Sequence, residues 1–583
     1  MKRLTLLLTA LALAGCAQQR VAGTDGGPVT VKVIAFNDFH GNLEVPGRPV
    51  DVQTADGTVV KVPAGGAAYF ATVVKRLKAQ AKYSVVVAAG DLTSASPLPS
   101  SLFLDEPTVT AMNMIGLEIT STGNHEFDRG TAELLRLQKG GCEKLTNRQP
   151  CQLEPFKGAA YTYLSGNTVR ADGSSLLPGT TIKRFGTGKN AITIGFIGLT
   201  TRMTATYVDP AGIKGYSFAD EAETANRLVP ALKAQGADAI VVLVHEGGYP
   251  ARTDQPEKCD GLSGPIVDIV NRLDPAIDLV VSGHTHRAYV CEMPKGDAAR
   301  PVLLTSAGNY GPFLTDITLT FDPVTKKLMA KSARQVVVQG DGNLSAAGPI
   351  KPVAAFPTVP ADPAVAALVA RYVKAAGPMA NKVVGRASAA IDRDEDSEIR
   401  ESPLGLLVAD AQLAATRKDG AQLSLMNPGG LRASLTPDPD GTVTYGDLYA
   451  VQPFGNNLQV MEFTGAQLRA VLEQQFSNID GPKVLFTSGL TYSFDQSKPE
   501  GQRIIAPMVA GQPLRDDATY RVALSTFLGG GGDGFSTLTK GRIVAGGMVD
   551  LDALVAYFGG GKTIDPPALG RVRNMTPEGW KAK

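Results

Sequence analysis

Short, nearly continuous runs of apolar residues recur through the first half of this 583-residue chain and constrain its fold more than any other feature. The runs are 29–36 (VTVKVIAF), 84–89 (SVVVAA), 192–199 (ITIGFIGL), 239–244 (AIVVLV) and 279–282 (LVVS). Because these runs do not alternate between apolar and polar residues, they predict strands covered on both faces. Helical stretches lie between several of them, and the later runs PVLLTSAG and DITLTF predict further strands. This half is therefore predicted to be α/β, or a layered αββα arrangement.

The length of the chain exceeds what one hydrophobic core supports, so a second domain is expected. Residues 340–364 are rich in Gly, Ala and Pro, a composition typical of a linker, and the segment 361–377 predicts a helix that ends at Gly377. Strands (YRVALS, LQVMEF) and helices follow. We place the first domain at 29–343, the linker and hinge helix at 344–380, and a smaller α/β domain at 381–575.

The N-terminus has the pattern of an export signal. Lys2 and Arg3 precede an apolar run that is too short to span a bilayer permanently. Residues 13–16 (LAGC) resemble the lipobox of bacterial lipoproteins, which implies cleavage after residue 15 and acylation of Cys16. An ordinary secretory signal is the alternative. Ala17 favours the outer membrane, and residues 17–28 predict a tether, so we expect a membrane-anchored, periplasm-facing protein.

The overall charge argues against a polymeric nucleic acid as partner. The chain has 57 Lys and Arg against 56 Asp and Glu, so no broad positive field attracts a phosphate backbone. An anionic substrate must therefore be captured locally. A mean hydropathy near zero indicates a soluble globular chain, which we expect to be a monomer.

Four cysteines besides Cys16 indicate disulfides in an oxidising compartment. Pairing by proximity predicts Cys142–Cys151 and Cys259–Cys291, although four cysteines allow three connectivities. None has the CxxC spacing of a thiolate zinc site.

All five histidines lie beside strand ends or in polar loops rich in Gly, Asn and Asp. They are His40, His125, His245, His284 and His286. One such histidine would usually be an ordinary polar residue of intermediate burial, but five of five are hard to explain that way. Ligands bind at the carboxyl ends of strands in α/β sheets.

The spacing of these residues favours a metal centre. Asp38 and His40 are two residues apart, so both could project from one side of an extended segment, and His284 and His286 repeat that spacing. Imidazoles and carboxylates without thiolates suit borderline-hard divalent ions such as Zn, Mn or Fe.

The ordered set D-x-H, GD, GNHE, a lone His after a strand, and GHTH resembles the calcineurin-type metallophosphoesterases. The whole chain, from Val29 to about Val572, resembles the bacterial 5′-nucleotidase family, which includes the periplasmic UDP-sugar hydrolases. The resemblance implies a four-layer αββα domain that binds two divalent metals (Zn, Mn or similar), with a linker helix and a C-terminal substrate-binding domain.

The resemblance also assigns the ligands. One metal would be held by Asp38, His40, Asp91 and His286, and the other by Asp91, Asn124, His245 and His284. Asp91 would bridge the two ions. Some relatives have Gln in place of His286, a difference that keeps a ligand.

His125 and Asp128 resemble the catalytic dyad of the family, with a structural loop histidine as the alternative. If GNHEFD opens a helix, the i,i+3 spacing lets Asp128 orient the imidazole. His125 would then stabilise charge on the phosphoryl oxygens.

The C-terminal half resembles the substrate-binding domain of the same family through NPGGLRASL, VQPFGNNL and STFLGGGGDGF. The implied substrate residues are Asn427, Gly429, Arg432, Phe454, Gly455, Asn456, Phe527 and Asp533. Phe454 and Phe527 would sandwich a nucleobase, since every base has a π-face. Taken alone, both phenylalanines would sooner be core residues.

The arginines that bind the charged end of the substrate do not match cleanly. Relatives place two arginines upstream of a helix start that corresponds to Gly405, but here Glu398 occupies one of these positions. Arg400 is therefore predicted to bind substrate together with Arg432, while Arg393 has no unambiguous register.

The predicted activity is metal-dependent hydrolysis of nucleoside 5′-monophosphates, with UDP-sugars, NAD or 2′,3′-cyclic nucleotides as further substrates. Two alternatives are a dimetal hydrolase of a non-nucleotide anion and a lipid-anchored binding protein that kept the fold. The paired phenylalanines argue against the first, and the intact ligand set argues against the second.

Overall fold

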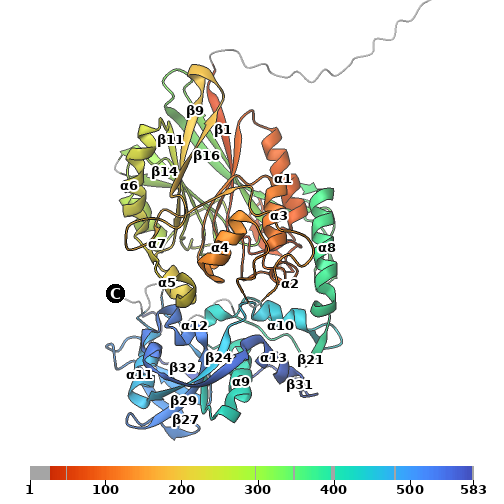
Figure 1. Ribbon diagram of the computed structural model, residues 1–583, viewed down its shortest axis with the longest axis vertical. Coiled ribbons are helices and arrows are strands. Elements are labelled where there is room, and N and C mark those ends of the chain that lie inside the picture. Colours follow the sequence, from red (N-terminus) through yellow and green to blue (C-terminus); the bar gives the residue numbers. More distant parts are fainter. Residues whose placement is uncertain are drawn as a thin grey trace, which may run out of the picture.

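A computed structural model shows two domains stacked along the long axis of the molecule (Figure 1). The described residues are 27–47, 49–146, 148–295, 297–345, 348–394, 401–477 and 481–580. The predicted signal peptide, Cys16 and most of the tether therefore lie outside the described residues, as does Arg400.

Two facing sheets form the centre of the N-terminal domain, each with six strands among the described residues. The first has the order β16 (Leu328–Val337), β15 (Phe313–Phe321), β1 (Val29–Phe36), β4 (Ser84–Ala89), β5 (Ile119–Ser121), β6 (Thr162–Leu164). The second has the order β13 (Ala288–Lys295), β14 (Asp297–Ala307), β12 (Leu279–Ser282), β11 (Ala239–His245), β9 (Ile192–Thr200), β8 (Thr180–Phe185). Strands β1, β4, β5 and β6 are parallel, as are β9, β11, β12 and β14.

Apolar residues form three layers, one between the sheets and one on the outer face of each. Because many strands are covered on both faces, their sequences do not alternate between apolar and polar residues. Val33, Val87, Phe196 and Val241 pack between the sheets. The outer face of the first sheet is covered by α1 (Ala67–Ala79), α3 (Glu106–Ile115) and α4 (Gly130–Lys139). The outer face of the second is covered by α6 (Glu221–Ala234) and α7 (Pro265–Arg272). The predicted αββα sandwich is confirmed.

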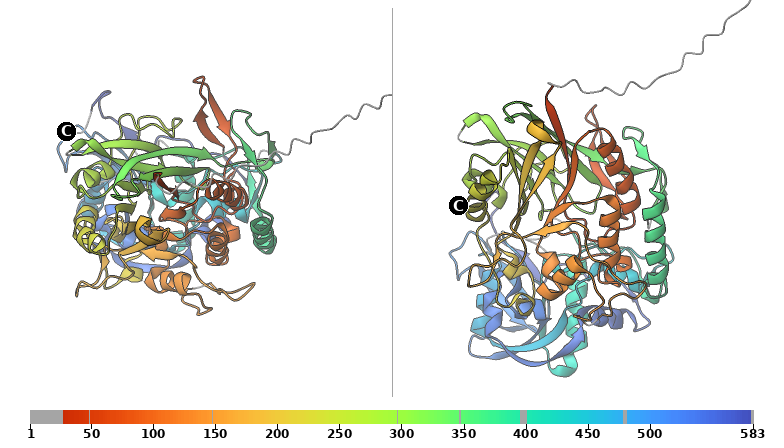
Figure 2. Two further views of the ribbon diagram at one scale, coloured as in Figure 1. Left: turned by 90° about the horizontal axis from the view of Figure 1, so that it is seen from above. Right: turned by 45° about the horizontal axis from the view of Figure 1, so that its top comes forward.

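The helix expected in the linker, α8 (Pro363–Ala380), packs on the N-terminal domain. Val365, Leu368 and Tyr372 join the same core as α1 and α3, and both views in Figure 2 show α8 beside these helices. Before it, β17 (Gln339–Gly340) pairs with β20 (Thr358–Val359), and β18 (Asn343–Ser345) pairs with β19 (Gly348–Ile350). Asp362 caps the helix, which continues through Pro378 beyond the predicted end at Gly377.

The C-terminal domain is built on a mixed sheet with the order β25 (Phe486–Ser488), β22 (Leu423–Met426), β29 (Thr519–Ser525), β24 (Asn457–Thr464), β30 (Arg542–Val549). Its helices are α9 (Pro403–Thr416), α10 (Tyr445–Val451), α11 (Gly465–Gln474), α12 (Thr526–Gly529) and α13 (Asp550–Phe558). A second sheet has the order β28 (Gln512–Pro513), β27 (Ile504–Val509), β26 (Leu490–Phe494), β32 (Val572–Asn574). A third joins β23 (Thr442–Thr444), β21 (Val383–Ala387) and β31 (Thr563–Ile564). The smaller α/β domain is thus present.

One of the two predicted disulfides is formed. Cys142 and Cys151 are bonded in the loop after α4. The predicted bond between Cys259 and Cys291 is wrong for this structure, because both are free thiols. Cys291 is buried on β13, and this burial together with the neighbouring Cys259 raises the pKa of its thiol. Within the described residues, no helix combines the length and apolar character needed to cross a membrane.

Candidate active site

Parallel strands from both sheets end at one edge of the sandwich and carry the predicted ligands there. Asp38, Asp91 and Asn124 follow β1, β4 and β5 of the first sheet. His245 ends β11 of the second sheet, and His284 follows β12. The carboxyl ends of parallel strands share one edge, so residues far apart in sequence meet at this point.

The ligand loops are sharply turned, which corrects the expectation of extended segments. The φ angles of Asp38, His40 and Asp91 are 49°, 45° and 51°, and those of His284 and His286 are 70° and 60°. Non-glycine residues rarely occupy this left-handed region, and such strain clusters at functional sites. Backbone hydrogen bonds hold the turns, with the N–H groups of Asp38 and His40 donating to the carbonyls of Gly90 and Asp91.

Two groups of side chains match the predicted metal sites. In the first, Nε2 of His286 lies 3.3 Å from Oδ1 of Asp38 and 3.2 Å from Nε2 of His40. In the second, Nε2 of His245 lies 2.9 Å from Oδ2 of Asp91, and His284 completes the group. The same Asp91 oxygen is 3.6 Å from Nε2 of His40, so Asp91 lies between the two groups, as a bridging ligand must.

Two imidazoles are held through the nitrogen that faces away from the centre. Nδ1 of His40 lies 3.0 Å from the carbonyl of Ser94, and Nδ1 of His245 lies 2.7 Å from the carbonyl of Ala89. A carbonyl fixes Nδ1 as the protonated nitrogen, which leaves Nε2 as a lone-pair donor. Both Nε2 atoms face Asp91.

Buried polar atoms without partners show that the donor set fits metal ions. Within the described part of the chain, Oδ1 of Asn124 is buried without a hydrogen-bond partner, and the buried Oδ1 of Asp38 and Nε2 of His245 face only other side chains of the two groups. Leaving such atoms unsatisfied is costly, so each needs a ligand. The set combines imidazole nitrogens with carboxylate and amide oxygens, which suits Zn or Mn.

The charges at the centre perturb its titration strongly. Burial opposes ionisation of Asp91, but the imidazoles of His245 and His125 outweigh it and hold the pKa of this carboxyl well below its usual value. Burial also opposes protonation of His245, but Asp91 and Asp38 raise its pKa to about 10. At His286 burial prevails and lowers the pKa to about 4. Perturbed pKa values are typical of functional sites.

Glu126, which we did not single out from the sequence, fixes two ligand loops to each other. Its carboxylate accepts hydrogen bonds from the backbone N–H groups of Asp91, Leu92 and Gly123 at 2.6 to 2.8 Å. These contacts hold the loop after β4 against the loop after β5. Its position beside His125 in GNHE was the available signal.

The predicted dyad forms across a short 3₁₀ turn, His125–Phe127, where an α-helix was expected. Nδ1 of His125 lies 2.8 Å from Oδ2 of Asp128, and the Oγ of Ser94 donates to the same carboxylate oxygen at 2.6 Å. Ser94 also accepts from His40 through its carbonyl. Ser94 therefore ties a metal-ligand candidate to the dyad.

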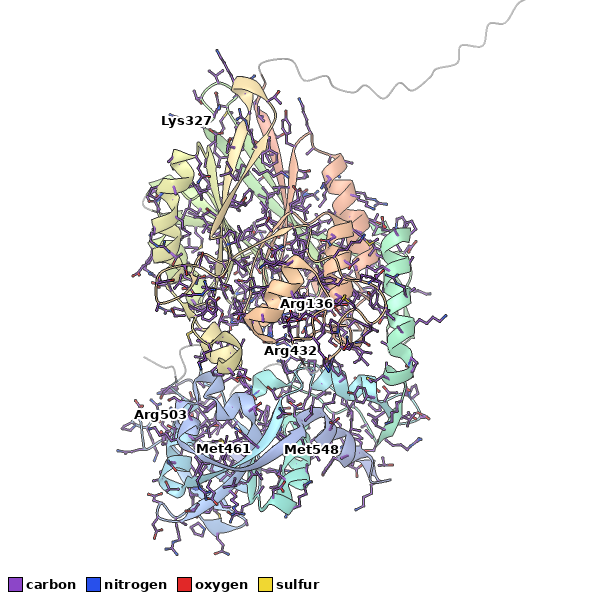
Figure 3. The ribbon with its side chains drawn as sticks, in the orientation of Figure 1. Arg136, Lys327, Arg432, Met461, Arg503 and Met548 are labelled. Carbon is purple, nitrogen blue, oxygen red and sulfur yellow. A yellow bond between two sulfur atoms is a disulfide. The ribbon has the colours of Figure 1, made fainter. Side chains whose placement is uncertain are left out.

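The C-terminal domain brings the guanidinium of Arg432 to this centre, over the ring of Phe454. Arg432 lies at the boundary between the domains in Figure 3, and within the described residues its Nε and Nη2 atoms are buried without a hydrogen-bond partner. Burial lowers the pKa values of His40 and His286, and the positive charge of Arg432 lowers them further. Arg432 therefore lies near both histidines. A guanidinium with two buried nitrogens that lack partners among the described residues favours an anionic ligand.

The aromatic residue predicted to bind a base contacts the dyad directly. The rings of Phe454 and His125 stack with centroids 5.7 Å apart and an interplanar angle of 15°. Both line a cavity of about 1280 Å³ that lies between the domains. Among its lining residues are the predicted Asp91, Asn124, Asp128, His284, His286, Asn427, Gly429, Arg432, Asn456, Phe527 and Asp533.

The remaining predicted residues are placed as follows. Gly455 does not line the cavity; its φ of 69° lets the turn present Phe454 and Asn456. Arg393, which had no clear register, does line it. The carboxylate of Asp533 accepts hydrogen bonds from Nδ2 of Asn427 at 2.6 Å and from Nζ of Lys483 at 3.2 Å.

Several residues that line this cavity were not predicted from the sequence. Asn309 lies 3.1 Å from Nδ1 of His286, and the ring of Tyr207 lies 5.3 Å from that of His284. Lys483 and Asp550 belong to the same group. They stand in segments without a distinctive motif, so no local signal marks them.

Comparison with known proteins agrees with this geometry. Residues 31–288 match the calcineurin-like phosphoesterase model, and residues 383–540 match the 5′-nucleotidase C-terminal domain model. A cell wall protein of Listeria monocytogenes is 30% identical over 99% of this chain and 72% of its own length. The chain belongs to the 5′-nucleotidase family.

Two further proteins extend the comparison. An endonuclease of Bacillus subtilis is 32% identical over 92% of this chain, but the match spans only 40% of that relative. The crystal structure of a 5′-nucleotidase precursor from Thermus thermophilus has a TM-score of 0.74 and 27% identity, covering 94% of this chain and 99% of that one. Its two-domain architecture is that of the present structure.

Proposed function

We propose that this chain hydrolyses nucleoside 5′-monophosphates to nucleosides and phosphate with the help of two divalent metal ions. The observation that carries the proposal is a single cavity lined by both metal-ligand groups and by the aromatic and amide side chains predicted to hold a base. The stack of His125 on Phe454 joins the two halves of that cavity. A phosphate at the metals would thus have its nucleoside beside Phe454.

The residues predicted as ligands would hold two ions, for which we propose Zn or Mn. The first site comprises Asp38, His40, Asp91 and His286, and the second comprises Asp91, Asn124, His245 and His284. Such a pair polarises the phosphate ester and lowers the pKa of the attacking water. The burial of Asp38, His40, Asp91 and His245 would strengthen these electrostatic effects.

The chain itself would stabilise the charge that develops on the phosphoryl group. With Nδ1 of His125 held by Asp128, its Nε2 is free to donate to a phosphoryl oxygen. Asp128 and Asp91 raise the pKa of His125 despite its burial, which favours the protonated donor. The guanidinium of Arg432 would bind a further oxygen.

The base would be held by Phe454 and Phe527, with Asn456 and Asp533 as polar contacts to base or ribose. The cavity volume exceeds the range of about 300 to 1,000 Å³ common for small-ligand sites, which leaves room for UDP-sugars, NAD or cyclic nucleotides. We propose these as further substrates.

A base-dependence experiment tests the function. The purified enzyme with Zn or Mn should release phosphate from AMP, and Phe454→Ala should lower kcat/KM for AMP relative to ribose 5-phosphate by about tenfold, since base stacking contributes ~1–3 kcal/mol. Ribose 5-phosphate is the matched substrate without a base. Equal losses on both substrates would argue against base stacking, and no release from AMP would refute the nucleotidase proposal.

We further propose that the chain is exported and anchored through an acylated Cys16, facing the periplasm. The LAGC sequence at residues 13–16 supports this proposal. Cys16→Ser should move the protein from the membrane fraction to the soluble fraction, measured by immunoblotting after cell fractionation. Retention of the variant in the membrane fraction would contradict lipid anchoring.

A further inference from the structure

A buried acid, Asp550, lies beside the predicted base site. Asp550 begins α13, is only 3% exposed and lines the cavity between the domains. Among the described residues, it forms no ion pair with a lysine, arginine or histidine. Carboxylates are rarely buried unless they are paired, so this one indicates a function beyond packing.

Asp550 is bonded reciprocally to Asn456. The backbone N–H of Asp550 donates to the carbonyl of Asn456 at 2.8 Å. In return, Nδ2 of Asn456 lies 3.5 Å from Oδ2 of Asp550. The other oxygen, Oδ1, accepts from the N–H of Leu551 at 2.7 Å. These hydrogen bonds hold the carboxylate of Asp550 against Asn456.

The surrounding strands make this contact rigid. Asn457 at the start of β24 pairs with Val549 at the end of β30, so the residues next to Asn456 and Asp550 are joined in the sheet. The turn that carries Phe454 is therefore anchored on the first turn of α13.

The contact determines which way the Asn456 amide points. An ionised carboxylate only accepts hydrogen bonds, so the amide must present its NH₂ group to Asp550. Its carbonyl oxygen then remains on the other side, and within the described residues this oxygen has no hydrogen-bond partner. Asn456 lines the cavity beside Phe454. A base at this position would meet an acceptor and would have to supply a donor.

We propose that Asp550 is a positioning residue that holds Asn456 as a hydrogen-bond acceptor, so that the site favours nucleobases with an exocyclic amino group over their oxo counterparts. Adenine and cytosine are the favoured class, and hypoxanthine and uracil are the disfavoured class. An oxo group would place two acceptors against each other and lose the bond. This inference rests on the proposed nucleotidase function and assigns its base preference.

The test compares paired substrates within each enzyme variant. Assays at pH 8.5 keep Asp550 ionised, because its burial raises its pKa to about 7. The wild type should prefer AMP over IMP, and CMP over UMP, by about tenfold in kcat/KM, the value of one hydrogen bond. Because both members of a pair share one enzyme preparation, a general loss of stability or metal cancels from the ratio.

Asp550→Asn is the decisive variant. An amide can donate as well as accept, so Asn456 is released to turn over, and the AMP to IMP ratio should fall to within about twofold of one. Asp552→Asn, an exposed position in the same helical turn, is the matched control and should keep the wild-type ratio. Asn456→Ala, which removes the amide, should also abolish the preference and serves if Asp550→Asn does not fold.

Several outcomes would overturn the inference. In the first, the wild type shows no preference between AMP and IMP. In the second, a folded Asp550→Asn or Asn456→Ala variant keeps the tenfold ratio. These results leave the nucleotidase proposal standing, because nucleotides are still hydrolysed. If the wild type hydrolyses ribose 5-phosphate but none of the four nucleotides, the proposed function fails and the base preference fails with it.

Discussion

Asp91→Asn is expected to abolish tight binding of the metal pair and to lower kcat/KM for AMP at least about a thousandfold, or about 4 kcal/mol. The substitution is nearly isosteric and keeps an acceptor for the backbone N–H of His125, which bonds Oδ1 at 2.9 Å. It removes the negative charge from the oxygen that lies between His245 and His40. A neutral amide cannot hold two cations together.

Two measurements separate this effect from misfolding. Metal content is determined by elemental analysis after dialysis, and folding by circular dichroism. Asp517→Asn, in an exposed ion pair with Arg515, is the control and should keep wild-type metal content and activity. Chelation of the wild type should reproduce the loss of activity, with recovery on adding Zn or Mn. A variant that retains two ions and full turnover would refute the bridging role of Asp91.

Gly123→Ala is expected to lower kcat/KM for AMP about a hundredfold, although glycine 123 supplies no side chain to the reaction. A Cβ at this position would lie 2.1 Å from Oδ1 and 2.6 Å from the backbone nitrogen of Asp91. Neither atom can move without displacing the loop after β4. A displacement of about 1 Å costs on the order of 10²-fold in rate, and the overpacking costs about 1–3 kcal/mol of stability.

The matched control for Gly123→Ala is Gly342→Ala, where an added Cβ meets open space. The control should keep its activity, and its free energy of unfolding should stay within about 0.5 kcal/mol of the wild type. Kinetics with AMP and thermal unfolding are measured on both variants. Normal activity in Gly123→Ala would show that the two ligand loops tolerate separation.

Much of the fold followed from local patterns. Runs such as 239–244 predicted buried strands because a strand covered on both faces must be apolar throughout. Composition predicted less where it allows more than one conformation. The Gly- and Pro-rich segment before α8 was predicted to be a linker from its composition, which did not indicate that its short strands pair or that α8 packs on the first domain.

The candidate site, too, was predicted from the sequence only in part. Spacing alone suggested that Asp38 and His40 act together, but it predicted extended backbone where the chain is left-handed. The i,i+3 spacing correctly indicated contact between His125 and Asp128. The contact of Cys259 with Cys291 was anticipated as a bond, whereas the two remain thiols.

The sequence by itself determined the chemical types of the donors and the order in which they leave the strands, because both are properties of short segments. Only the tertiary structure decided that strands from two sheets meet at one edge, that Phe454 stacks on His125, and that Asp550 is buried against Asn456. These contacts join residues that are far apart in the sequence, by 94 positions for Asn456 and Asp550 and by more for the others. Their distances depend on how the layers pack, and no local periodicity encodes that packing.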